Sequence, residues 1–177
     1  MTDSRKAVQA DVDALGDVFA DVRALLKNAD VDLFQTVPEV SDWSPAQHLY
    51  HVLGATAMML KASALLAHGA VEGEPAGLSV AGEKVLSSGT IDRGVATAPE
   101  KTMPPGALSR EDLDASFARS YGKFEAAAEA LADGAPDDRG LPHPMWGVLT
   151  SQQWIKAARV HCRHHLAIID DIRVGSA

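Results

Sequence analysis

The 177-residue sequence contains a single cysteine, Cys162, and this scarcity excludes a fold held together by internal disulfide bonds. A lone cysteine is compatible with a reducing compartment, and we expect a cytoplasmic protein. Positive charge is also scarce, because 16 lysine and arginine residues stand against 24 aspartate and glutamate residues, for a net charge of −8. Such a surface repels nucleic-acid phosphates, so we expect no nucleic-acid partner.

The sequence also lacks the marks of a secreted or membrane protein. Residues 1–6 are polar and run straight into an amphipathic pattern, with no apolar signal-peptide core. Residues 44–71 carry one formal charge, Lys61, and their length suits a membrane span. Because this stretch also contains several histidines and a glutamine, we interpret it as a helix buried on most sides of a soluble bundle. We therefore expect no membrane partner.

Four stretches have the hydrophobic periodicity of long helices, and we predict helices over residues 4–28, 44–68, 109–134 and 150–173. The last three begin with a capping residue, Ser44, Ser109 or Thr150, followed three positions later by a residue that completes a capping box.

Residues 70–108 have a different character, because glycine and proline interrupt them repeatedly. We predict a short helix at residues 79–86 and otherwise a long ordered crossover, and a loop of this length is a candidate for a pocket wall. The sequence shows no repeat and no strand-like alternation. We therefore predict an all-α fold, a four-helix bundle with a long crossover between its second and third helices, forming a single domain over residues 1–177.

The last predicted helix carries the most informative chemical pattern. Its inward stripe, with steps of four and three, consists of Trp154, Ala158, His161, His165, Ile168 and Ile172. Two imidazoles one turn apart therefore point toward the core, where they need either hydrogen bonds or an ion. Side chains at i and i+4 can hold one ion together, so the spacing favours a divalent metal over a hydrogen-bonded core pair.

His51 is the expected third ligand, because it lies on an inward stripe of the second predicted helix together with Ala55 and Met58. His48, one turn earlier, is the competitor; alternatively it lines the pocket or orients a ligand. The predicted metal ligands are thus His51, His161 and His165, and three histidines leave a coordination position open.

Three further histidines are candidates for proton transfer, namely His48, His143 and His164, and no catalytic residue can be singled out among them. His143 lies between two prolines, where it either stabilises its loop through backbone hydrogen bonds or touches a substrate; we favour the loop role. His164 lies off the central stripe, either behind the ligands or at the surface. Cys162 points away from that stripe, and we interpret it as packed and inert.

These motifs resemble the DinB/YfiT-like superfamily. In that family a tryptophan precedes a helix start and a histidine eight residues later, as Trp43 precedes His51, and an H-x-x-x-H pair lies on the last helix, as His161 and His165 do. The run 143–150 is similar to an uncharacterised branch of the family. The resemblance implies a four-helix bundle whose three histidines bind a divalent ion, zinc or nickel above all, and commonly a homodimer. Some relatives are thiol-dependent transferases or isomerases that use bacillithiol or mycothiol.

Three functional hypotheses follow. The first is a metal-dependent enzyme, a hydrolase or a thiol-dependent transferase acting on a small molecule, since such ions lower the pKa of bound water toward ~7. The second is a metal- or ligand-binding protein without turnover, which needs the same histidines but no general base. The third is a helical interaction module whose histidines are structural.

Overall fold

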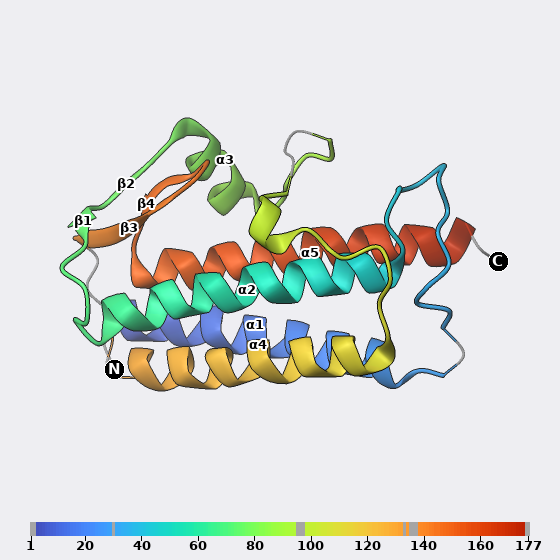
Figure 1. Ribbon diagram of the computed structural model, residues 1–177. Coiled ribbons are helices and arrows are strands. Elements are labelled where there is room, and N and C mark those ends of the chain that lie inside the picture. The colour runs from blue at the N-terminus through green and yellow to red at the C-terminus, as the bar shows by residue number, and fades with distance from the viewer. Residues whose placement is uncertain (1–2, 30, 95–97, 133, 135–137, 176–177) are drawn as a thin grey trace.

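The computed structural model describes residues 3–29, 31–94, 98–132, 134 and 138–175. Four long helices lie side by side (Figure 1), and α2 contacts α4 and α5 while α1 contacts the same two helices from the other side. The helices are α1 (Asp3–Lys27), α2 (Pro45–Ala67), α3 (Val80–Ser88), the 3₁₀ helix η1 (Glu100–Thr102), α4 (Arg110–Leu131) and α5 (Ser151–Gly175).

Capping hydrogen bonds explain why the long helices begin where the sequence predicts. The Ser44 hydroxyl accepts the backbone N–H of Gln47, and the Gln47 side chain accepts the backbone N–H of Ser44. The same reciprocal pair opens the later helices at Ser109–Asp112 and at Thr150–Gln153. Each pair satisfies N–H groups that have no partner within the helix. The predicted helices and the crossover between α2 and α4 are thereby confirmed.

The all-α prediction is wrong in one respect, because the structure contains a small antiparallel sheet. Its strands are β1 (Glu74–Pro75), β2 (Gly77–Leu78), β3 (Arg139–His143) and β4 (Gly147–Leu149), in the order β1-β3-β4-β2. They are two to five residues long, too short for an alternating hydrophobic pattern to be visible in the sequence. The sheet joins the start of the crossover to the loop before α5, and Figure 1 shows it beside α3 at the beginning of α5.

Two glycines allow this sheet to pack closely against its neighbours. A Cβ atom at Gly82 in α3 would overlap the backbone carbonyl of Trp146. Gly147, the first residue of β4 after the turn from β3, has a φ of +87°, in the left-handed region that side chains disfavour. The position of α3 against the β3–β4 hairpin therefore depends on both glycines.

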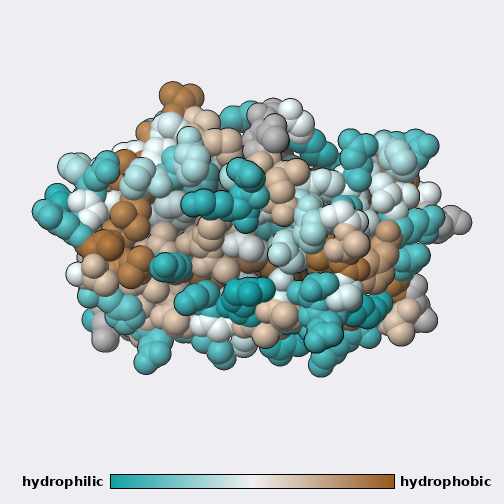
Figure 2. All heavy atoms as spheres, viewed as in Figure 1, coloured by the Kyte–Doolittle hydropathy of each residue, from teal (hydrophilic) through white to brown (hydrophobic). Residues whose placement is uncertain are grey.

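Helix α2 is the most apolar element. Among the described residues it is the only helix long and apolar enough to cross a membrane, but 56% of its apolar window is buried within the fold, as in the core helix of a soluble protein. One detail of its predicted inward stripe is wrong, since Met58 is 48% exposed. Helix α2 carries apolar side chains on most of its faces, so the hydrophobic periodicity of its sequence cannot show which face is buried. Hydrophobic residues reach the surface only in separate patches on the face seen in Figure 2.

Aromatic side chains fill the contact between α1 and α4, which we call the phenyl seam: Phe19, Phe117, Tyr121 and Phe124. Phe19 meets Phe117 and Tyr121 edge to face, with ring centroids 5.9 and 5.6 Å apart. Arg23 covers the outside, with its guanidinium carbon 4.8 Å from the Tyr121 centroid. Such edge-to-face contacts add to the stabilisation that burial of the rings provides.

Candidate metal centre

Three histidines from two helices converge between α2 and α5. One ring nitrogen of each of His51, His161 and His165 lies within 4.8 Å of the others. His51 and His165 are buried and His161 is partly exposed. These are the three residues that the sequence singles out as ligands, and they can hold a metal ion. We call them the three-histidine centre.

The crossover fixes the orientation of His51. Its Nδ1 lies 2.9 Å from the backbone carbonyl oxygen of Thr102 in η1. Because a carbonyl only accepts hydrogen bonds, Nδ1 carries the ring proton and the lone pair of the neutral ring lies on Nε2. Burial lowers the pKa of His51, and the bond to Thr102 opposes this shift in part. His51 is thus held neutral with one nitrogen ready to bind a cation.

His165 is held by His48 in the same way. Nδ1 of His165 lies 2.9 Å from Nδ1 of His48, and Nε2 of His48 lies 2.9 Å from the Ser41 hydroxyl. One proton must lie between the two Nδ1 atoms, on one ring or the other. When it lies on His165, that residue donates to His48, His48 donates to Ser41, and the lone pair of His165 lies on Nε2. In that state the chain of hydrogen bonds leaves Nε2 as the nitrogen of His165 that can bind an ion.

The distance between the two α5 histidines fits a shared ion. Nε2 of His161 and Nε2 of His165 are 3.2 Å apart. Two nitrogens bound tetrahedrally to one zinc ion lie about 3.3 Å apart, given zinc–nitrogen bonds of about 2.0–2.1 Å. Nδ1 of His161 is buried and has no hydrogen-bond partner among the described residues, so its N–H requires a water or a substrate group. The spacing of the nitrogens therefore fits a divalent ion.

The electrostatics of the centre favour neutral rings, as metal ligands require. Burial, followed by the neighbouring charges of His51, His164 and His143, lowers the pKa of His161 to about 3. Burial and the charges of His51, His164 and Arg93 lower the pKa of His48 to about 4. The pKa of His165 is lowered further, mainly by burial and then by His161. Near neutral pH, no proton competes for these lone pairs.

His143 has a structural position in the hairpin. Its Nδ1 accepts the backbone N–H groups of Met145 and Trp146, at 3.2 and 3.3 Å, and its ring stacks on Trp146 with centroids 4.2 Å apart. Burial lowers the pKa of His143 to about 4. These are the backbone hydrogen bonds expected of a histidine that stabilises its loop.

His164 and Cys162 flank the ligands on α5. The ring of His164 lies 5.1 Å from that of His165, and burial and the charge of Arg93 lower its pKa, against a hydrogen bond to the backbone of Ile91. Cys162 is buried beside the Thr56 hydroxyl, and burial raises the pKa of its thiol to about 11. The cysteine therefore stays a protonated thiol, in agreement with the predicted inert role.

Sequence reasoning missed two contributors to the centre, the Ser41 hydroxyl and the Thr102 carbonyl. Neither could be found from the sequence, because one is a serine in a loop and the other is a backbone group. Trp43 lies with its ring 5.3 Å from the ring of His48 and 5.2 Å from that of His51, so it forms one wall of the centre. In the sequence, only the spacing of eight residues between this tryptophan and His51 pointed to its place beside the centre.

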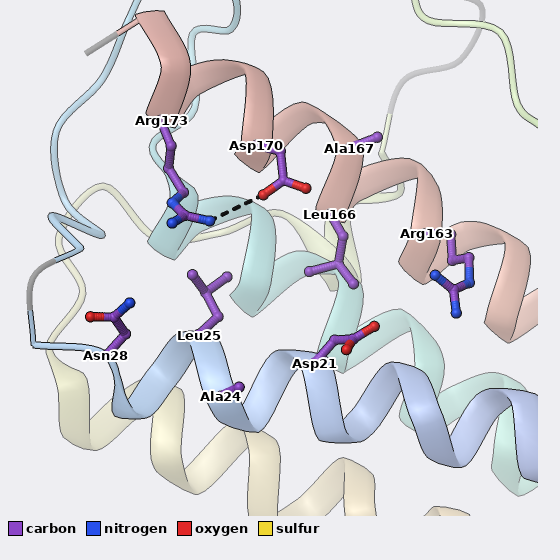
Figure 3. Close-up of a pocket in the computed structure, with 9 residues that line it drawn as sticks. All are labelled: Asp21, Ala24, Leu25, Asn28, Arg163, Leu166, Ala167, Asp170 and Arg173. Carbon is purple, nitrogen blue, oxygen red and sulfur yellow. Dashed lines mark hydrogen bonds and ion pairs between the residues drawn. The ribbon is translucent and has the colours of Figure 1, made fainter. Parts of the chain in front are cut away.

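The larger of two described cavities, about 570 Å³, lies elsewhere, in a groove between α1 and α5 (Figure 3). Leu25 and Leu166 line it together with charged residues, and Arg173 donates to Asp170 at 3.2 Å across its edge. No histidine occurs among the described residues that line this groove. It is therefore separate from the three-histidine centre.

Comparisons with known proteins agree with this geometry at the level of the family. A comparison with curated proteins and one with solved structures give no match. A model of the DinB superfamily, in contrast, matches residues 6–169, which include all three histidines of the centre. The match spans nearly the whole sequence, and the chain therefore belongs to the DinB superfamily.

Proposed function

We propose that this protein is a divalent-metal-dependent enzyme that acts on a small molecule as a hydrolase or a thiol-dependent transferase. The observation that carries the proposal is the convergence of His51, His161 and His165, two of which are oriented by hydrogen bonds from their far nitrogens. Imidazole suits zinc and nickel, the two metals that we propose. A bound ion of this kind supplies Lewis acidity, which lowers the pKa of a water or thiol.

The residues around the centre have separate tasks in this proposal. Thr102 and His48 hold the Nδ1 protons of His51 and His165, which directs the ligand lone pairs inward. Trp43 excludes water from one side, because its ring packs against His48 and His51. His164 is the remaining proton-transfer candidate, since it lies beside His165 and also lines a neighbouring cavity.

A metal-binding protein without turnover is the second candidate, and one observation favours it. Two of the three predicted proton-transfer residues are engaged in structural hydrogen bonds, His48 with His165 and Ser41, and His143 with the hairpin backbone. A protein that only holds an ion needs no general base, so this arrangement suits it.

The test begins with elemental analysis of protein purified without a histidine tag, before and after reconstitution with zinc, nickel and manganese. We expect about one first-row metal ion per chain, lost in His51→Ala and in the His161→Ala/His165→Ala double variant. His68→Ala is the matched control, because His68 is an exposed histidine at the end of α2 and should leave the metal content unchanged.

Metal-loaded protein is then screened against esters, amides and thiol conjugates. Turnover that disappears in His51→Ala supports the enzyme, while a bound ion without turnover supports the second candidate. If wild-type protein binds no metal after reconstitution, both proposals fail and the histidines belong to a structural module.

We also propose that the four long helices form the four-helix bundle expected of the family and that the chain acts as a homodimer in the cytoplasm. The apolar composition of α2 and the exposure of Met58 support a surface that a second copy covers. Light scattering on eluting protein, compared between wild type and Met58→Lys, tests the dimer.

A further inference from the structure

A second cavity, of about 260 Å³, lies directly beside the three-histidine centre. Crossover residues 89–91 and Arg93 form one wall and a face of α5 forms the other. Ile91, Val160 and Ala167 supply apolar lining, and Arg93, Arg163 and His164 supply the polar groups. We call it the crossover pocket.

The crossover pocket is cationic in a chain that is strongly acidic overall. Two arginines line it, and no carboxylate is present among the described lining residues, although the net charge of the sequence is −8. Arg163 makes no hydrogen bond or ion pair with the described part of the chain, and it also borders the groove of Figure 3. Two of the 16 lysine and arginine residues of the chain thus line one small cavity that no described carboxylate lines.

Arg93 is anchored but keeps free hydrogen-bond donors. Its Nη2 donates to the Asp171 carboxylate at 2.6 Å, which ties the crossover to α5. Both side chains are about half exposed, so this pair adds little stability and leaves part of the guanidinium open to solvent. A guanidinium has five N–H donors in a planar fork, and the remaining ones suit a second oxyanion.

The crossover pocket and the three-histidine centre share a wall. His164 lines the pocket, and its ring lies 5.1 Å from the ring of the predicted ligand His165. A molecule bound in the crossover pocket therefore lies next to the three-histidine centre.

We propose that the crossover pocket binds an oxyanion, a carboxylate or a phosphate-type group, carried by the small molecule whose reacting end lies at the three-histidine centre. This inference rests on the proposed function, because it assigns a charge to the substrate of that same site. Arg93 holds the anion through its free donors, Arg163 adds a second positive charge, and Ile91 and Val160 contact the apolar part of the molecule.

Cobalt-loaded protein offers a direct binding assay, because a thiolate that reaches cobalt gives a charge-transfer absorption. The probes are mercaptoacetate, mercaptopropionate, mercaptobutyrate and mercaptohexanoate, each matched with the neutral mercapto-alcohol of equal length; mercaptoethylphosphonate distinguishes phosphate-type from carboxylate recognition. We expect at least one anionic thiol to bind roughly tenfold more tightly than its neutral match, since hydrogen bonds to charged groups are the strong ones.

Arg93→Ala should remove most of that preference, Arg163→Ala part of it, and Arg173→Ala none, because Arg173 lies outside the crossover pocket. Equal affinity for anionic and neutral thiols, or a preference that survives the Arg93→Ala/Arg163→Ala double variant, overturns the inference while leaving the metal centre intact. Failure to take up cobalt instead overturns the proposed function. Circular dichroism of each variant separates loss of the pocket from loss of the fold.

Discussion

The phenyl seam and the three-histidine centre are both clusters of rings between two helices, and they are held together in opposite ways. Phe19 meets its neighbours on α4 with centroids 5.1–5.9 Å apart, and His51 meets His161 and His165 at 5.2 and 4.8 Å. The phenyl rings need only each other, because their stabilisation comes from burial and ring–ring contact. Each imidazole has two nitrogens that also need a partner.

That difference explains why one seam consists of helices alone and the other does not. The groups that satisfy the histidines come from outside the long helices, Ser41 from the loop before α2 and Thr102 from η1 in the crossover. A polar cluster of this kind therefore depends on loop residues for its hydrogen bonds. The crossover that supplies one of these bonds also forms a wall of the crossover pocket and carries charged residues. In this protein the long crossover gives the centre its chemical surroundings.

The largest effect should come from breaking the phenyl seam. Phe19→Ala removes a ring that is 2% exposed, and we expect a loss of about 3–5 kcal/mol in the free energy of unfolding. Metal stoichiometry at a temperature where the variant is folded should not change, because no residue of this seam belongs to the three-histidine centre. Urea unfolding and elemental analysis measure the two quantities, and Phe19→Leu, which keeps most of the volume, should lose much less. Loss of metal from the folded variant would show that the two regions are coupled.

An intermediate effect should come from removing the hydrogen bonds that orient the proposed metal ligands. His48→Ala removes the group that orients His165, and outer-shell changes of this kind typically weaken metal binding about 10- to 100-fold. His48→Asn places an oxygen where Nδ1 accepts the His165 proton, so it should restore much of the affinity. Competition with a coloured zinc chelator measures both variants. Affinities equal to wild type in His48→Ala would remove His48 from its orienting role.

The smallest effect, taken per histidine and per pH unit, should appear as a dependence of stability on pH that the histidine region has and the phenyl seam lacks. The pKa of His48 is about 4 and that of His161 about 3 in the folded chain, against an ordinary 6.5, so below pH 6.5 the unfolded chain binds more protons. In metal-free protein, the contribution of these histidines to the free energy of unfolding is therefore fully present above pH 6.5. It falls as the pH drops toward 4, by roughly 1.4 kcal/mol per pH unit for each such histidine.

Urea unfolding of metal-free wild type and Phe19→Ala, at about pH 7 and about pH 5, measures this slope. The destabilisation caused by Phe19→Ala should be the same at both values, because no histidine lies in the phenyl seam. A flat pH profile in wild type would mean that the buried histidines are protonated without penalty.

The helices and the three convergent histidines could be predicted because their signals are local and periodic. Capping pairs such as Ser44 and Gln47 mark helix starts within four residues, and the i, i+4 spacing of His161 and His165 places both rings on one face. His51 required one further step, the assumption that the stripes of two helices face each other at the same level.

The remaining features depend on contacts between distant parts of the chain, which no local pattern encodes. The strands are too short to show a period, and Glu74 finds its partner at Gly140. The Thr102 carbonyl is a backbone group that any residue could supply, and the exposure of Met58 depends on which face of an apolar helix its neighbours happen to cover.

The small sheet also affects the order in which parts of the protein fold. Long helices form from neighbours in the chain, whereas the pairing of residues 74–78 with 139–149 must close a loop that includes all of α4. Contacts between residues so far apart form slowly, because the chain entropy lost on closure comes before the gain from pairing. We therefore expect the crossover to pack over α2 and α5 after the helices have assembled, so that the Thr102 carbonyl reaches His51 late, in an almost finished fold.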